Sequence, residues 1–180
     1  MSPLIPTCPP KPIYWRPANL AGYGTLFANV GDYDLGGAPA SWSKVVAARH
    51  ALTEFPDARY IWYLDQDALI MNPNLRVEEY IMAASRLQES MLRDLPVVPP
   101  DSIIKTFSNL RGDDVALALT QDKDGMAVGS FVLRNGDWAR FLLDTWFDPL
   151  YRSYNFQKAE LHTLVSGGNV RKKKKKRQKC

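Results

Sequence analysis

Apolar residues recur at helical spacing in the stretch SWSKVVAARHALTEF, which covers residues 41–55. The positions that share one face of such a helix are Val45, Ala48, Ala51, Leu52 and Phe55. This periodicity predicts an amphipathic helix. We expect Ser41 or Ser43 to cap its start and Pro56 to end it.

A different pattern follows at residues 59–64, RYIWYL, where aromatic and aliphatic side chains occupy both alternating faces. We interpret this run as a short strand buried on both sides, which is typical of a sheet flanked by helices. The triplet NPN at 72–74 predicts a turn. Residues 75–93 predict a second amphipathic helix, which PVVPP at 96–100 ends. Its apolar positions include Leu75, Tyr80, Met82, Leu87 and Met91.

Two more apolar runs, DVALALTQ at 114–121 and MAVGSFVLRN at 126–135, predict a pair of strands. The intervening DKDG ends in an Asp-Gly pair, which favours a hairpin. Residues 137–147 predict a helix, with Asn135 or Asp137 as its cap. The side chains of this helix that we expect to face inward are Trp138, Phe141, Leu142 and Trp146.

The remaining patterned segments are residues 155–165, which predict another helix, and residues 21–40, where frequent Gly and Pro predict short strands and turns. Helices that alternate with buried strands indicate an α/β layered domain. The length of 180 residues allows one domain with a core, or a large part of a bigger one. A hydrophobic content of 46% is typical of a globular protein.

The net charge of +4 is unevenly distributed. Residues 171–179, RKKKKKRQK, hold eight basic residues, which leaves 15 Lys and Arg against 19 Asp and Glu in residues 1–170. The body of the chain is therefore mildly acidic. A nucleic-acid or acidic-surface binder that acts through the basic tail is one possible class. We do not expect a nucleic-acid partner, because the body carries no recognised nucleic-acid motif.

The cysteines and the apolar segments of the chain give little further information about its function. Cys8 and Cys180 lie at opposite ends of the chain, and two cysteines make neither a disulfide framework nor a zinc site. No run of about 18 apolar residues occurs, so we expect no membrane span in this chain. The start, MSPLIPTCPPKP, contains too many prolines for a signal peptide.

Two carboxylates, Asp65 and Asp67, come directly after the buried strand. On an extended backbone their side chains point the same way, while Gln66 points the other way. Such close carboxylates repel each other unless a cation lies between them. Carboxylate oxygens suit hard cations such as Mn²⁺ or Mg²⁺. The sequence thus favours a divalent-cation site at the carboxyl end of the strand, and a merely solvated turn is the alternative.

Two long blocks carry a family resemblance: SWSKVVAARHALTEFPDARYIWYLDQDALIMNP and DKDGMAVGSFVLRNGDWARFLLDTWFDPLYRS. They resemble glycosyltransferase family 34, which includes fungal α-1,6-mannosyltransferases and α-galactosyltransferases, and they span roughly residues 20–162. The resemblance is nearest to subunits of the mannan polymerase II complex. It implies an α/β fold of the GT-A type, a nucleotide-diphospho-sugar transferase sandwich with a mixed sheet flanked by helices. We expect an irregular leader at 1–19, a partial GT-A domain at 20–166 and a basic tail at 167–180.

The resemblance also assigns roles to residues. Asp65 and Asp67 would hold Mn²⁺ (or Mg²⁺) against the diphosphate of GDP-mannose. Lys44 would add a positive charge near the phosphates, or else be an ordinary helix-surface lysine. Gln66 is a further expected substrate-binding residue.

Further along the chain, Gly129 and Ser130 would lie under the sugar, and a strand glycine at a bulge is the alternative for Gly129. Glu160 falls near an acidic position that lies by the reacting sugar or acceptor in the family. We take it as the catalytic candidate, with a solvated helix carboxylate as the alternative.

The other chemically suggestive side chains have simpler interpretations. We interpret Asp124 and Asp144 as structural, and His50 and His162 as packing or surface residues. The aromatic residues that we assign to the core are Trp62, Tyr63, Trp138 and Trp146.

The implied activity is retaining transfer of a hexose onto a glycan acceptor in N-glycan or mannan elongation. We expect mannose from GDP-mannose in α-1,6 linkage, although galactose and xylose transfer also occur in the family. The alternative is a non-catalytic or inactive subunit that joins other mannan polymerase subunits. The family implies the lumenal side of the Golgi membrane.

Two family features have no match in the sequence: the first nucleotide-binding strand and a C-terminal histidine ligand. We therefore expect a member truncated at both ends, with a mis-predicted gene end as the source of the tail.

Overall fold

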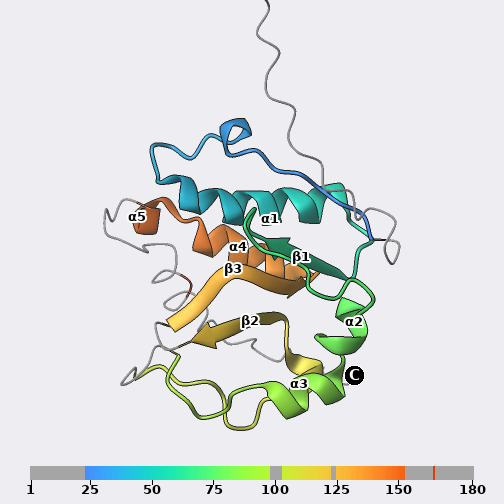
Figure 1. Cartoon of the computed structure of the whole chain (residues 1–180). Helices are drawn as coiled ribbons and strands as arrows, with labels where there is room; N and C mark the ends of the chain where they lie inside the picture. The colour runs from blue at the N-terminus through green and yellow to red at the C-terminus, as the bar shows by residue number, and fades with distance from the viewer. Residues whose placement is uncertain (1–22, 98–102, 123–124, 153–163, 165–180) are drawn as a thin grey trace, which may run out of the picture.

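The computed structural model of the protein describes residues 23–97, 103–122, 125–152 and 164. Its centre is a three-stranded sheet in the order β1-β3-β2, made of β1 (Tyr60–Leu64), β2 (Leu117–Asp122) and β3 (Gly125–Arg134). Both strand pairs are antiparallel. The prediction of a mixed sheet is therefore wrong for the described strands, because β2 and β3 form a hairpin and β1 runs against β3 (Figure 1).

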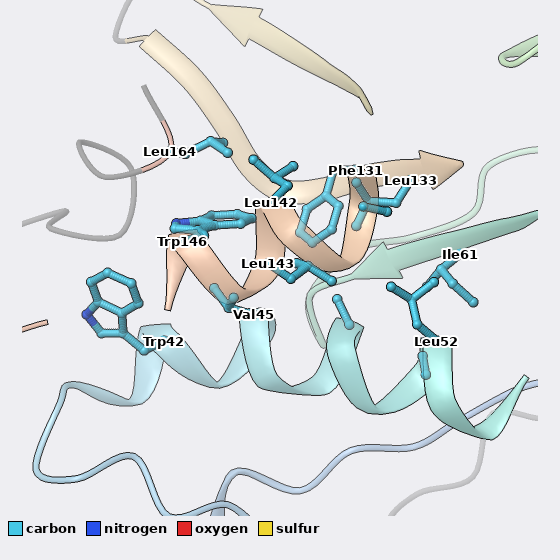
Figure 2. Close-up of a cluster of buried hydrophobic side chains, with 13 residues drawn as sticks. Trp42, Val45, Leu52, Ile61, Phe131, Leu133, Leu142, Leu143, Trp146 and Leu164 are labelled. Carbon is cyan, nitrogen blue, oxygen red and sulfur yellow. The ribbon is translucent and has the colours of Figure 1, made fainter. Parts of the chain in front are cut away.

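One face of the sheet is covered by α1 (Ser43–Glu54) and α4 (Asp137–Trp146), which confirms both predicted helices (Figure 1). Their apolar faces and the sheet enclose what we call the first core cluster (Figure 2). Its buried members are Trp42, Val45, Ala48, Ala51, Leu52, Ile61, Phe131, Leu133, Ala139, Leu142, Leu143, Trp146 and Leu164. The apolar face expected for residues 41–55 is confirmed, with Phe55 partly buried at its edge.

The opposite face carries α2 (Val77–Tyr80) and α3 (Ala84–Ser90). The buried residues there, the second core cluster, are Val77, Met82, Leu87, Val115 and Val132. Strand β1 serves both faces: Ile61 and Tyr63 pack with the first cluster, whereas Tyr60 and Trp62 pack with the second. Both faces of β1 thus pack against core residues, as predicted, because alternate side chains of one strand point to opposite faces, but only Ile61 is buried and the other residues of the strand are half-buried.

The single helix predicted for residues 75–93 is wrong, because the chain leaves helical geometry at Ala83 (φ −64°, ψ 133°) between α2 and α3. The spacing of the apolar residues explains the break. Val77, Met82 and Leu87 lie five positions apart, which would place successive members about 140° apart around an unbroken helix. The break brings all three to the second core cluster. Leu75 and Tyr80, expected on the apolar face, are exposed.

Neither predicted pair of helix caps is correct. The residue before α1 is Trp42, and the short 3-10 helix η2 (Ala40–Trp42) leads directly into α1 without a capping side chain. Before α4 the cap position is Gly136. The amide of Asn135 instead donates hydrogen bonds to the backbone oxygens of Pro56 and Ala58, which ties the start of α4 to the loop after α1.

Other predictions have mixed outcomes. The turn at 72–74 is confirmed by a hydrogen bond from the Asn74 N–H to Asn72 Oδ1. Phe141, expected to face inward, is exposed, whereas Leu142 and Trp146 are buried. Within residues 23–42, the structure has turns and the 3-10 helices η1 (Val30–Asp32) and η2, and no strand.

The short elements η3 (Gly112–Asp114) and α5 (Pro149–Arg152) complete the described part. The predicted helix at 155–165 lies outside it except for Leu164, which is buried in the first core cluster. Glu160, Asp124 and His162 also lie outside it, as do the predicted leader and tail. Among the described helices, none combines the length and hydropathy needed to cross a bilayer.

Candidate active site

Asp65 lies immediately beyond β1, at the end of the sheet ladder. Its N–H donates to the Gly129 carbonyl at 2.8 Å, and its carbonyl accepts from the Ala68 N–H at 3.0 Å. The second bond closes a β-turn with Gln66 and Asp67 at its centre. The assumption that residues 65–67 are extended is therefore wrong, because the strand ends at Leu64.

The Tyr63 hydroxyl lies beside Asp65, and the negative charge of Asp67 also acts on it. This hydroxyl donates to Asp65 Oδ1 at 2.6 Å. The pKa of Tyr63 is raised far above its ordinary value, first by burial, then by the hydrogen bond to Asp65 and by the negative charges of Asp65 and Asp67. The hydroxyl therefore remains a donor, and both carboxylates lie close enough to influence it.

Lys44, in the first turn of α1, faces the same carboxylate from the other side. Its Nζ lies 3.6 Å from Asp65 Oδ2. The residue is only 8% exposed, so the interpretation as an ordinary helix-surface lysine is wrong. A buried ammonium requires a compensating partner, and Asp65 supplies it. The Asp65 side chain itself is 35% exposed, which leaves it accessible to a ligand.

Gly129 completes the surroundings of Asp65. A Cβ at this position would lie 2.9 Å from Asp65 Oδ2, closer than two such atoms normally approach. Strand β3 also bulges here: Leu119 pairs with Phe131 but Thr120 pairs with Ala127. The bulge interpretation of Gly129 is thus confirmed, and the absent side chain also leaves space beside the carboxylate.

Ser130 is separated from this group. Its Oγ accepts a hydrogen bond from Trp62 Nε1 at 3.1 Å, on the face of the second core cluster. The structure therefore brings Lys44, Asp65 and Gly129 together and places Ser130 across the sheet from them. Gln66 and Asp67 are exposed at the turn. The substrate and metal roles of all these residues remain predictions.

Tyr63 contacts the candidate site, and sequence reasoning does not include it among the site residues. It was assigned to the core, and its ring does stack on Phe131, with centroids 5.0 Å apart and planes at 19°. Its position two residues before Asp65 was the available signal, because alternation places residues 63 and 65 on one face of a strand.

Two other polar residues, Asp144 and His50, make contacts with residues outside the candidate site. Asp144 accepts from Arg49 Nε at 2.9 Å, which links α4 to α1. His50 Nδ1 lies 3.0 Å from the Tyr33 hydroxyl at the surface. Both were interpreted as structural or surface residues, and these contacts support that.

The side chains of the candidate site can be compared with the ligands that a divalent cation requires. Within the part of the chain that the structure describes, no three His, Cys, Asp or Glu side chains are grouped to hold a metal. Asp65 and Asp67 offer hard oxygen ligands on an accessible turn. Mg²⁺ and similar cations keep several waters and share phosphate oxygens, so two carboxylates are sufficient for an ion that a phosphate ligand completes. The residues fit such an open site and not a closed structural one.

Comparison with known proteins identifies the chain. The galactosyl transferase GMA12/MNN10 family matches residues 16–166. An uncharacterized alpha-1,2-galactosyltransferase of Schizosaccharomyces pombe is 32% identical over 161 residues, 84% of this chain and 43% of that protein. A second such protein of the same yeast is 35% identical over 71% of this chain and 39% of its own length.

The probable alpha-1,6-mannosyltransferase MNN10 of Saccharomyces cerevisiae is 36% identical over 61% of this chain and 28% of its own length. The chain therefore spans less than half the length of these relatives. No solved structure matches it. The extent of the family match confirms the family resemblance noted in the sequence, and the chain belongs to the galactosyl transferase GMA12/MNN10 family, glycosyltransferase family 34, whose members named above are hexosyltransferases.

Proposed function

We propose that Asp65 and Asp67 hold a divalent cation, Mn²⁺ or Mg²⁺, against the diphosphate of a nucleotide sugar. The protein would then transfer the hexose to a glycan acceptor with retention of configuration. The observation that carries this proposal is the environment of Asp65. Its carboxylate is fixed by Tyr63, faces the buried Lys44 and borders the side-chain-free Gly129, yet remains partly exposed.

Each residue has a physical task in this proposal. The cation, when bound, supplies Lewis-acid stabilisation of the departing diphosphate. Lys44 adds a fixed positive charge beside the phosphates, and its burial strengthens that charge by excluding water. Gly129 allows close approach to Asp65. Gln66 lies exposed at the same turn, within reach of a ligand. Glu160 remains the catalytic candidate and lies outside the described residues.

The donor sugar is proposed from the relatives. The likeness to two probable alpha-1,6-mannosyltransferases of Saccharomyces cerevisiae, MNN10 and MNN11, supports mannose from GDP-mannose. The several relatives named as alpha-1,2-galactosyltransferases support galactose as the second candidate. Family membership suggests action on the lumenal side of the Golgi membrane. The association with other mannan polymerase subunits stays a prediction.

The test is cation-dependent turnover of the two donors. GDP-mannose and UDP-galactose are incubated with the chain and Mn²⁺, and release of the nucleoside diphosphate is measured with and without a mannoside acceptor. Asp67→Asn should abolish release, because the amide carries no negative charge for the cation. Asp144→Asn is the matched control, since Asp144 lies on α4 and pairs with Arg49 of α1.

Turnover of GDP-mannose that depends on Mn²⁺ and Asp67 supports the proposal, and turnover of UDP-galactose instead would correct the donor. Binding of donor and Mn²⁺ without turnover is the result expected of a non-catalytic subunit. Turnover unaffected by Asp67→Asn would contradict the assigned site.

A further inference from the structure

We propose that Tyr63 is a positioning residue that makes Asp65 a single-oxygen ligand and so favours small octahedral cations over Ca²⁺. This inference rests on the proposed function, because it assumes that Asp65 binds a cation. It adds one point that the proposed function does not contain: Tyr63, which does not itself touch the ion, determines the cation selectivity of Asp65.

The first step of the argument is that the Tyr63 hydroxyl is held in place. Its ring stacks on Phe131, which is 2% exposed and packs against Trp146 in the first core cluster. A ring fixed on a buried neighbour cannot swing away without breaking that packing. The hydroxyl therefore keeps its 2.6 Å hydrogen bond to Asp65 Oδ1.

The second step concerns the other oxygen. Asp65 Oδ2 borders Gly129 and lies 3.6 Å from Lys44 Nζ, an ion pair that is longer than a hydrogen bond. Because Oδ1 already accepts a hydrogen bond from a hydroxyl, it is the weaker ligand, and Oδ2 is the oxygen that Asp65 offers more readily to a cation.

The third step concerns the number and geometry of the oxygen ligands that each cation requires. Ca²⁺ accepts six to eight oxygen ligands and often uses both oxygens of one carboxylate. Mg²⁺ demands near-ideal octahedral geometry, is bound by one or two carboxylates and keeps several waters. A carboxylate restricted to one oxygen therefore disadvantages Ca²⁺ more than Mn²⁺ or Mg²⁺.

The experiment measures binding of each cation alone to the full chain, without donor or acceptor. Free Mn²⁺ is followed by electron paramagnetic resonance and Ca²⁺ by calorimetry, for the wild type and Tyr63→Phe. The substitution keeps the stacking ring and removes only the hydroxyl. Tyr60→Phe is the matched control, because Tyr60 lies on the same strand but packs with the second core cluster.

We expect Tyr63→Phe to weaken Mn²⁺ binding about tenfold, as loss of a partner that orients a ligand typically does. Ca²⁺ binding should weaken less or improve, because Oδ1 becomes available, so that the ratio of the two affinities changes. A purely structural role would weaken both cations by the same factor. Equal weakening, or an unchanged Kd for Mn²⁺, would overturn the inference.

A second variant keeps the test valid if Tyr63→Phe fails to fold. Gly129→Ala introduces a methyl group 2.9 Å from Asp65 Oδ2, so the carboxylate must shift from the position in which the Tyr63 hydroxyl holds it. The same fall in Mn²⁺ preference is expected, and an unchanged preference would contradict the inference. A wild-type chain that binds neither cation, alone or with GDP present, would instead overturn the proposed function, and this inference with it.

Discussion

The two faces of the sheet are built very differently. On one face, α1 and α4 run for 12 and 10 residues and enclose the fully buried Trp42, Phe131 and Trp146. On the other, α2 and α3 run for only 4 and 7 residues over a smaller cluster. Tyr63 and Lys44 both come from the first, better-packed face. The difference indicates that the candidate site depends on rigid packing beneath it.

The largest expected effect compares one leucine from each face. Leu143 in the first core cluster is 1% exposed and Leu87 in the second is 6% exposed. We expect Leu143→Ala to cost about 4 kcal/mol of unfolding free energy and Leu87→Ala about 2 kcal/mol, because a tightly enclosed cavity relaxes less. Urea denaturation of both variants measures the difference. Equal losses would show that the two faces are equally well packed.

Sequence pattern predicted the first face better than the second, for a physical reason. The regular spacing of Val45, Ala48 and Leu52 is a property of one continuous helix, so it can be recognised locally. The break at Ala83 has no such local signal. It arises because Val77, Met82 and Leu87 must all reach the same cluster, which is a tertiary requirement.

In the candidate site, too, sequence pattern predicted some features and not others. Asp65 and Asp67 stand out in the sequence because two carboxylates follow a buried strand. The burial of Lys44 could not be predicted, since its apolar neighbours and its partner Asp65 come from different elements. The turn at residues 65–68 was also missed; its backbone hydrogen bond joins Ala68 to Asp65, which accepts from the Tyr63 hydroxyl.

A smaller effect is expected from the buried ion pair of the first face. Lys44→Met keeps most of the side-chain volume and removes the charge. We expect the affinity of the Mn²⁺-loaded chain for GDP to fall about tenfold, since hydrogen bonds to charged groups contribute about 1.5–3 kcal/mol. Mn²⁺ alone should bind no more weakly, because Asp65 loses a competing cation. Calorimetry measures both.

The control comes from the second face. Arg86 pairs with Glu89 at 3.7 Å, and both side chains are more than half exposed. Arg86→Met should alter neither binding nor stability measurably, because exposed ion pairs contribute little. An unchanged GDP affinity in Lys44→Met would remove the proposed phosphate role of Lys44.

The smallest expected effect concerns a contact between the N-terminal segment and α2. The Tyr23 hydroxyl donates to Glu78 and accepts from the Val77 N–H. The hydrogen bond from Tyr23 lowers the pKa of Glu78 below its usual 4.5. The associated stabilisation is present above that usual value and is lost as pH falls through the lowered one.

Tyr23→Phe should therefore cost about 1 kcal/mol or less at pH 7, with a smaller difference from the wild type in acid. Urea denaturation across this pH range measures it. Tyr33→Phe is the control, because Tyr33 bonds His50 and no glutamate. A Tyr23→Phe effect that is independent of pH would show that the bond to the Val77 N–H dominates.

The central claim is that one cation is shared by Asp65 and Asp67. Crystals of the full chain grown with MnCl₂ and GDP would locate the ion by its anomalous scattering. We predict a manganese peak coordinated by Asp65 Oδ2, an Asp67 oxygen and the diphosphate. A peak elsewhere on the chain, with the diphosphate bound away from this turn, would contradict the account.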